Sequence, residues 1–290
     1  MLKEFLSQVR DQVSTNIKKS IGKTNPIEIA MSYSALSESK MIRAGLIFAS
    51  GKINGGISNN SLITLASAIE LMHTYSLIHD DLPCMDDDDI RRGKPSTHIK
   101  FGESTAVLAG NSLLTLAFEI LSSPKLKLNE KIKINLIKKL SECSGHLGIA
   151  GGQYLDLSYE RKKISRNKIL EMEIKKTGML FSFCCAAPAI IKKKTIQEIK
   201  FFENIGSKIG LLFQIADDLI DLKSNSKEAG KKTGKDQKKG KATLINLIGY
   251  DDSLKYCDKI IKDINKNLRK YGSKSEKINE TLNYILNRKK

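Results

Sequence analysis

Two clusters of aspartates carry the side chains of this sequence that are best suited to chemistry. The first lies in the segment DDLPCMDDDDIRR, residues 80–92, where six aspartates fall within ten residues and two arginines follow. Such a density of carboxylates is repulsive unless cations lie among them. Oxygen ligands favour a hard divalent cation such as Mg2+, and a guanidinium binds two phosphate oxygens at once. The segment therefore indicates a magnesium site for a phosphate-bearing ligand, although a solvated acidic loop is the alternative for such a run taken alone.

The second cluster is QIADDLID, residues 214–221, inside an apolar-periodic stretch that predicts a helix from about 195 to 222. On a helix, Asp217, Asp218 and Asp221 share an arc of roughly 100°. The rest of the stretch is apolar, so a bare acidic face would be costly there. The pattern favours a second set of metal ligands.

The first cluster requires a break in its own helix. Asp80 and Asp86 are six residues apart and would point about 120° away from each other on an unbroken helix. Pro83 disrupts helical geometry and moves Leu82 away from helical angles. We therefore expect a helix from about 60 to 81, followed by a bulge that brings the later aspartates back toward the first two.

Five sequence blocks extend the pattern over most of the chain. They are YSLIHDDLPCMDDDDIRRGKPSTHIKFG (75–102), GGQYLDL (151–157), KTG (176–178), QIADDLID (214–221) and GKKTGKDQKKGKAT (230–243). In this order they resemble the trans-prenyltransferase (polyprenyl diphosphate synthase) family, and most of all its bacterial farnesyl-producing members.

The resemblance implies an all-α, single-domain helical bundle with a central catalytic cavity, the isoprenoid synthase fold, with the two aspartate motifs on opposite walls. The sequence agrees, because glycines and prolines mostly separate apolar-periodic stretches and no run alternates with period two. We expect one domain over residues 1–290. The expected helices are 2–21, 27–50, 60–81, 104–122, 128–147, 167–187, 195–222, 241–249, 251–271 and 275–288.

The resemblance also implies a reaction. Two or three Mg2+ ions per active site would neutralise an allylic diphosphate, which then ionises to a carbocation that the double bond of isopentenyl diphosphate attacks. No protein nucleophile is needed, and no Ser/His/Asp or Cys/His signature occurs. The expected metal ligands are Asp80, Asp81, Asp86, Asp217, Asp218 and Asp221.

Basic and polar residues take roles through the same resemblance. The expected isopentenyl diphosphate ligands are Lys40, Arg43, His73 and Arg92. The expected residues around the allylic diphosphate are Arg91, Lys176, Thr177, Gln214, Lys231 and Lys241. A surface charge, or for the histidine a packed core residue, is the alternative for each. The segment SESKMIRAG, residues 37–45, departs from the family, which usually has a Gly-Gly-Lys-Arg stretch closing in Arg-Pro.

Product length is expected to depend on the residues below Asp80 on its helix. Tyr75 lies about 7.5 Å deeper and resembles the family's aromatic stop, while Ser76 points closer to the direction of Asp80. A fifteen-carbon product is expected, with geranylgeranyl or geranyl diphosphate synthesis as alternatives. A terpene cyclase and a non-catalytic helical subunit are more distant alternatives.

Composition limits the partners and the compartment. The net charge is +17, but only eight of 49 basic residues are arginine and the densest basic patch has no interleaved aromatic, so nucleic-acid binding is not expected. The five cysteines lack zinc spacing, and the first residues lack an apolar signal core. The longest apolar run has twelve residues and contains Pro188, so no membrane span is expected. These features indicate a cytoplasmic protein, and the family suggests a homodimer.

Overall fold

The computed structural model describes residues 1–227 and 241–287, and most of them are helical. They form two compact units. Unit 1 contains Met1–Lys139 and Ala187–Lys194, and unit 2 contains Leu140–Ala186 and Thr195–Lys290. The predicted all-α fold is confirmed, and the expectation of a single domain stays a prediction.

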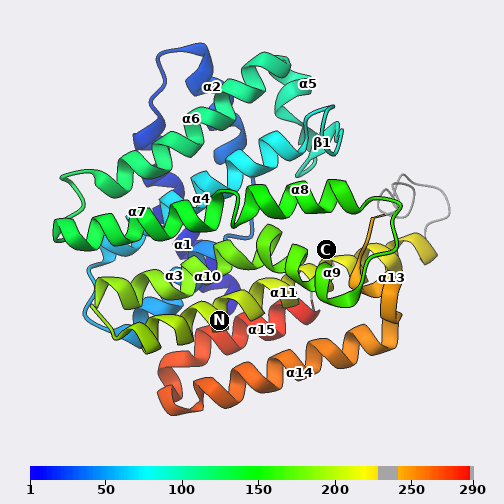
Figure 1. Cartoon of the computed structure of the whole chain (residues 1–290). Coiled ribbons are helices and arrows are strands. Elements are labelled where there is room, and N and C mark those ends of the chain that lie inside the picture. The colour runs from blue at the N-terminus through cyan, green and yellow to red at the C-terminus, as the bar shows by residue number, and fades with distance from the viewer. Residues whose placement is uncertain (228–240, 288–290) are drawn as a thin grey trace. The chain divides into compact units, whose positions relative to one another are not determined.

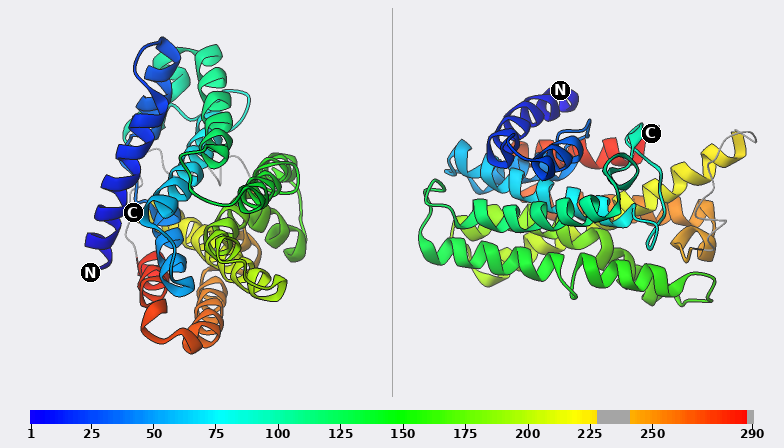
Figure 2. Two further views of the ribbon diagram at one scale, coloured as in Figure 1. Left: turned by 90° about the vertical axis from the view of Figure 1, so that its left-hand side faces the viewer. Right: turned by 90° about the horizontal axis from the view of Figure 1, so that it is seen from above.

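Unit 1 is built around one buried helix. The helices that begin in it are α1 (Leu2–Ile21), α2 (Pro26–Ala35), α3 (Ile42–Asn54), α4 (Asn59–Asp80), α5 (Thr97–Phe101), α6 (Glu103–Ser122) and α7 (Glu130–Ser144). Helix α4 contacts α1, α3 and α6 (Figures 1 and 2). It is apolar on most of its circumference, which is the pattern expected of a helix surrounded by others.

The predicted helix over 27–50 is wrong, because two helices occupy this range. Helix α2 ends at Ala35, and α3 begins only at Ile42. Met41, between them, adopts a left-handed conformation with φ 51°, which a right-handed helix cannot contain. The start of α2 is set by Asn25, whose side chain accepts the Glu28 amide in a capping box.

A short hairpin follows the first aspartate cluster. Strands β1 (Ile90–Arg91) and β2 (Lys94–Pro95) pair antiparallel. The two connecting residues, Arg92 and Gly93, have φ 53° and 74°, as a tight two-residue hairpin turn requires. The hairpin was absent from the sequence prediction because its strands are too short to show a period.

Unit 2 contains most of the later helices. The helices that begin in it are α8 (Ile149–Tyr159), α9 (Arg166–Glu173), α10 (Met179–Ile191), α11 (Ile196–Lys227), α13 (Leu244–Ile248), α14 (Tyr250–Leu268) and α15 (Glu276–Asn287). A π-helical turn, η1 (Ile174–Gly178), joins α9 to α10, and a 3-10 turn, η2 (Arg269–Ser275), joins α14 to α15. Helix α8 was not predicted from the sequence, whereas the expected helices over 195–222, 241–249, 251–271 and 275–288 are present within a few residues of their bounds.

The core of unit 2 forms where α10 and α11 meet. Phe181 is fully buried, and its ring centroid lies 5.4 Å from that of Phe213 on α11. Cys184 and Cys185 are buried in the same apolar stretch. All five cysteines lie in the described part of the chain and none forms a disulfide, as their number and spacing indicated.

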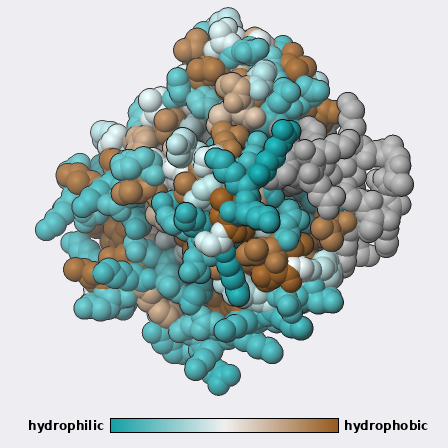
Figure 3. All heavy atoms as spheres, turned by 45° about the vertical axis from the view of Figure 1, so that its right-hand side comes forward, coloured by the Kyte–Doolittle hydropathy of each residue, from teal (hydrophilic) through white to brown (hydrophobic). Residues whose placement is uncertain are grey.

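Three helical stretches are long and apolar enough to cross a membrane when judged by length and composition alone. They are Asn59–Asp80, Glu103–Ser122 and Arg166–Ile191. In the first and the third, most of the apolar window is buried within the protein, as for a core helix. Figure 3 shows hydrophilic side chains spread over one face of the molecule, with smaller hydrophobic patches among them. The expectation of no membrane span stays a prediction.

Close packing of α8 against η1 depends on Gly152. A Cβ at this position would lie 2.2 Å from the backbone nitrogen of Lys176. We expect Gly152→Ala to lower the free energy of unfolding by about 1–3 kcal/mol, because the backbone must move apart to admit the methyl group. Urea denaturation measures this. The control is Ser158→Ala on the same helix, for which a small change is expected; equal stability of Gly152→Ala and wild type would contradict the packing argument.

Candidate active site

The chain bulges directly after α4. The amide of Asp86 donates to the carbonyl of Asp80 at 2.8 Å, and the amide of Asp88 donates to the carbonyl of Asp81 at 3.1 Å. The carbonyl of Leu82 accepts from two further amides of the same loop. The return of Asp86 toward Asp80 that Pro83 predicted is therefore confirmed at the level of the backbone.

Asp81 forms an ion pair with Arg91. Nε of Arg91 lies 2.9 and 3.2 Å from the two carboxylate oxygens, and a second guanidinium nitrogen donates to the same carboxylate. The same guanidinium reaches Asp88 at 3.3 Å. Burial raises the pKa of Asp81, and the hydrogen bond from Arg91 opposes that rise. Asp81 thus anchors the hairpin arginine, and its expected role as a metal ligand stays a prediction.

The donor set of the first motif fits magnesium. Asp80 and Asp86 offer only oxygen atoms, and their backbones are hydrogen-bonded to each other. A hard cation with one or two carboxylate ligands and several waters needs no more from the protein. Asp80 and Asp86 are therefore suited to hold such an ion, and their role as its ligands stays a prediction.

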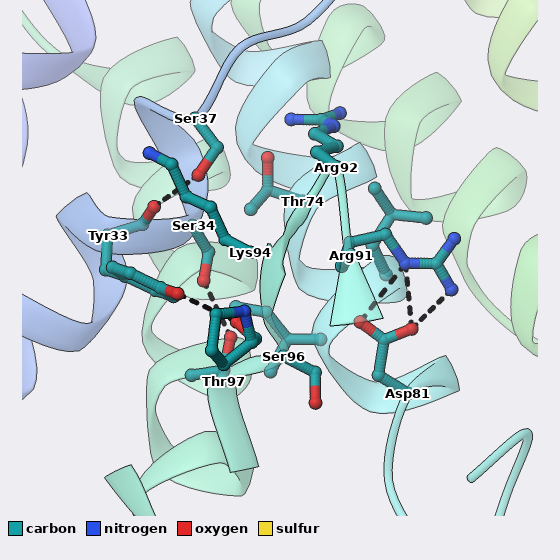
Figure 4. A pocket seen from close by; sticks show the side chains of 13 residues that line it. Tyr33, Ser34, Ser37, Thr74, Asp81, Arg91, Arg92, Lys94, Ser96 and Thr97 are labelled. Atoms are coloured by element: carbon teal, nitrogen blue, oxygen red, sulfur yellow. Dashed lines mark hydrogen bonds and ion pairs between the residues drawn. The ribbon is translucent and has the colours of Figure 1, made fainter. Parts of the chain in front are cut away.

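The adjacent arginines point in different directions. Figure 4 shows the side chain of Arg91 reaching down to Asp81, while the side chain of Arg92 extends upward, away from Asp81. Arg91 is the last residue of β1, whereas Arg92 is in the left-handed turn. The change of backbone conformation between Arg91 and Arg92 directs their guanidinium groups to different places. Their expected assignment to different substrates requires such a separation.

Three of the four residues expected at isopentenyl diphosphate interact electrostatically. The pKa of His73 lies well below its usual value, first because the ring is buried and then because of the charges of Arg43, Arg92 and Arg91. His73 is therefore neutral at pH 7 and carries one N–H donor. Lys40 is exposed in the segment before α3.

The second aspartate motif lies on α11, next to a short hydrogen-bond chain. The Thr177 hydroxyl donates to Oε1 of Gln214 at 2.9 Å, and Nε2 of Gln214 donates to Asp218 at 2.9 Å. These bonds bring three residues of the expected set together in unit 2. Asp217 and Asp221 keep the one-turn spacing on the same helix.

The π-helical turn η1 presents Lys176 and Thr177. A π turn inserts an extra residue into a helix, and such turns are frequent at functional sites. Lys176 donates to Oδ2 of Asp156 at 2.5 Å, and Nζ of Lys241 lies 3.7 Å from the same oxygen. Asp156 therefore joins two lysines that were expected separately at the allylic diphosphate.

Sequence reasoning gave no role to Asp156 or Glu173. Both line a cavity of unit 2 together with Lys176, Gln214, Asp218 and Lys241. Burial raises the pKa of Glu173; the amide of Leu244 opposes this and the charge of Asp156 adds to it, so that the pKa is about 8. The position of Asp156 in the GGQYLDL block was the available signal, but its lysine partners lie outside that block.

The residues expected to limit product length lie one turn or more before Asp80. The ring of Tyr75 stands edge-to-face to His79 with centroids 5.5 Å apart, and its pKa is raised by burial and then by the charge of Asp80. Ser76 is buried and donates to the carbonyl of His73. Their proximity to the motif agrees with the expectation, and their role stays a prediction.

Two further observations concern another group of possible metal ligands and one residue expected at the site. A ring nitrogen of His98 and one carboxylate oxygen each of Asp87 and Asp89 lie within 4.8 Å of one another, a group that the sequence analysis did not single out. Lys231, expected near the allylic diphosphate, lies outside the described residues.

An all-α chain with two aspartate motifs, each close to basic side chains, has the characteristics of a metal-dependent enzyme that acts on a diphosphate. Comparison with known proteins gives its family: residues 24–285 match the polyprenyl synthetase model. The chain therefore belongs to the polyprenyl synthetase family of prenyltransferases.

Relatives match over almost the whole chain. The chain is 35% identical to farnesyl diphosphate synthase of Escherichia coli K12, over 100% of this chain and 98% of the relative. It is 36% identical to geranylgeranyl pyrophosphate synthase 4 of Arabidopsis thaliana, over 99% of this chain and 78% of the relative. The solved geranyltransferase of Helicobacter pylori, in complex with magnesium and isoprenyl diphosphate, is 30% identical, with a TM-score of 0.81 and coverage of 99% and 96%.

The raised pKa of Glu173 makes stability depend on pH. The folded protein holds this proton up to about pH 8, whereas the unfolded chain releases it near 4.5. The unfolding free energy therefore falls as pH rises between these values, by up to a few kcal/mol. We expect Glu173→Gln to remove this fall, measured by urea denaturation at pH 5.5, 7 and 8.5.

The matched control is Glu171→Gln, which alters an exposed carboxylate two residues earlier. It is expected to keep the dependence of the wild type over this range. Parallel curves for Glu173→Gln and wild type would show that Glu173 is ionised in the folded protein at neutral pH.

Proposed function

We propose that the chain is a farnesyl diphosphate synthase. It joins isopentenyl diphosphate head-to-tail to dimethylallyl diphosphate and then to geranyl diphosphate, and releases diphosphate at each step. The observation that carries the proposal is the bulge after α4, in which the Asp86 amide binds the Asp80 carbonyl and two carboxylate-bearing residues come together beside Arg91. The family and the name of the Escherichia coli relative support it.

The aspartates hold the magnesium ions that the reaction requires. When bound, Mg2+ would neutralise the diphosphate leaving group and so favour its departure from the allylic carbon. Asp80 and Asp86 would hold ions in the first motif, and Asp217 and Asp221 would do so in the second. Asp81 and Asp218 orient Arg91 and Gln214, to which they are hydrogen-bonded. The family and the magnesium in the Helicobacter pylori structure support this cofactor, and we propose two or three ions per site.

Lysines of unit 2 bind the allylic diphosphate. Lys176 and Lys241 supply two ammonium groups to a cavity that Asp156 and Asp218 also line, and protonated Glu173 adds no further negative charge there. Thr177 and Gln214 present polar atoms next to Lys176. The departing diphosphate is held by these groups and accepts the proton lost at the end of the condensation.

Isopentenyl diphosphate binds to the basic group of unit 1. Arg43 and Arg92 supply forked guanidinium donors for the diphosphate, and Lys40 supplies an ammonium. Neutral His73 donates one hydrogen bond without adding charge. Keeping this ring neutral avoids further repulsion among the cations before the substrate arrives.

Geranylgeranyl diphosphate is the alternative product within the same family. The Arabidopsis thaliana relative is named for geranylgeranyl pyrophosphate, and its identity to this chain equals that of the farnesyl relative within one percentage point. The two extra residues in DDxxxxD and the aromatic ring of Tyr75 favour fifteen carbons. We further propose a single catalytic domain, a homodimer and a cytoplasmic location.

A direct assay tests the function. Purified protein is incubated with Mg2+, isopentenyl diphosphate and either dimethylallyl or geranyl diphosphate, and the dephosphorylated products are separated by chromatography. Farnesol is the expected main product from both starters. Cyclic products would favour a terpene cyclase, and the absence of any condensation would contradict the proposal.

Loss of a motif carboxylate should impair turnover more than stability. We expect Asp80→Asn and Asp217→Asn each to lower kcat by about a hundredfold or more, because each removes a ligand of an ion that neutralises the leaving group. The melting temperature should change little. Asp251→Asn, at the exposed start of α14, is the control and should keep wild-type kcat. Wild-type turnover of either motif variant at saturating Mg2+ would reject the assignment.

Product length should depend on the ring of Tyr75. We expect Tyr75→Ala to give products of about twenty carbons or more, because removing the ring opens space about 7.5 Å below Asp80 for the growing chain. Chromatography of the products measures the shift. Tyr154→Ala, which alters a residue that is 72% exposed, should leave the length unchanged. An active Tyr75→Ala enzyme that still stops at fifteen carbons would place the limit elsewhere.

A further inference from the structure

Glu70 is a buried acidic residue that no step of the proposed reaction uses. It lies in the interior of α4, ten residues before Asp80, and is only 5% exposed. An ionised carboxylate at such a site is costly unless hydrogen bonds and opposite charges compensate. The neighbours of Glu70 supply both.

The first neighbour is the start of α3. Oε1 of Glu70 accepts a hydrogen bond from the amide of Ala44 at 3.1 Å. Ala44 is the third residue of α3, and the first amides of a helix have no partner within the helix. Met41, which precedes α3, makes no side-chain cap hydrogen bond. Glu70 therefore caps α3 from another helix, and its charge is favoured at that helix N-terminus.

The second set of neighbours is a pair of arginines. Burial raises the pKa of Glu70 above its usual value, and the charge of Arg43, the hydrogen bond from the Ala44 amide and the charge of Arg92 offset only part of that rise. The same interaction acts on Arg92, whose pKa is lowered by burial and raised by the charge of Glu70. One carboxylate thus acts on two guanidinium groups that come from α3 and from the hairpin turn.

We propose that Glu70 is a positioning residue for isopentenyl diphosphate, which holds Arg43 and Arg92 ready for the diphosphate. This inference rests on the proposed function of the same site. Two cations from separate segments repel each other in the absence of ligand, and a shared counter-charge keeps both side chains in place. A diphosphate then binds without the cost of ordering them.

Glu70→Gln tests the role of the charge. Glutamine keeps a side-chain oxygen that accepts from the Ala44 amide, but it carries no charge. We expect the KM for isopentenyl diphosphate to rise about tenfold, while kcat and the KM for geranyl diphosphate stay within about twofold. The melting temperature should stay within a few degrees of wild type, because the cap is retained.

The matched control is Ser67→Ala, about one turn earlier on α4. Its buried hydroxyl accepts from the side-chain amide of Asn16 and carries no charge, so both KM values should stay near wild type. Glu70→Asp keeps the charge on a shorter side chain, and its KM for isopentenyl diphosphate should lie between those of wild type and Glu70→Gln. If Glu70→Gln does not fold, Glu70→Met, which is also uncharged and of similar length, takes its place, and an unchanged KM for isopentenyl diphosphate in that variant overturns the inference.

Two other results would overturn it. An unchanged KM for isopentenyl diphosphate in folded, active Glu70→Gln would mean that the side chain only caps α3. A lower KM would mean that its charge competes with the diphosphate. These outcomes require active wild-type enzyme, whereas wild-type protein that condenses no isopentenyl diphosphate would reject the proposed function itself and this inference with it.

Discussion

Repulsion among the carboxylates at the end of α4 is the constraint on which the unit 1 site depends. The helix ends at Asp80, where its dipole is negative and disfavours further anions. The chain compensates with a backbone bulge and with Arg91, which pairs with both Asp81 and Asp88. The hairpin places Arg91 beside the aspartate motif. Asp80 and Asp86 have the donor chemistry of a divalent cation site, in agreement with the family of the chain.

Burial controls the charge of the groups that support each basic cluster. In unit 1 it keeps His73 neutral beside three arginines, and in unit 2 it keeps Glu173 protonated beside Asp156. Burial disfavours the charged form of both groups: a positive imidazole at His73 and a negative carboxylate at Glu173. Unit 1 gains no additional cation, and the unit 2 cavity gains no third carboxylate beside Asp156 and Asp218. Each cluster thus keeps a charge suited to a diphosphate.

Packing distances decide whether these charges meet. Gly152 lets α8 approach the backbone of Lys176, and four residues later Asp156 receives the Lys176 ammonium. The π turn η1 gives Lys176 and Thr177 their positions on the facing element. The ion pair between Lys176 and Asp156 therefore depends on Gly152, because a larger residue there would hold α8 and η1 apart. Backbone conformation also shapes the site at Met41. Its left-handed conformation separates α2 from α3, and Glu70 then caps the start of α3.

The sequence by itself determined the helices with a clear apolar period, the one-face spacing of Asp217 and Asp221 and the bulge at Pro83, because each depends on residues close along the chain. It missed the break before α3, the hairpin and α8, whose local signals are weak or short. Only the tertiary structure identified the partners of Asp156 and Glu70. Asp156 meets a lysine 20 residues away and Glu70 meets an amide 26 residues away. Periodicity reports which face of an element is buried, whereas the partner of a buried charge depends on how the elements pack.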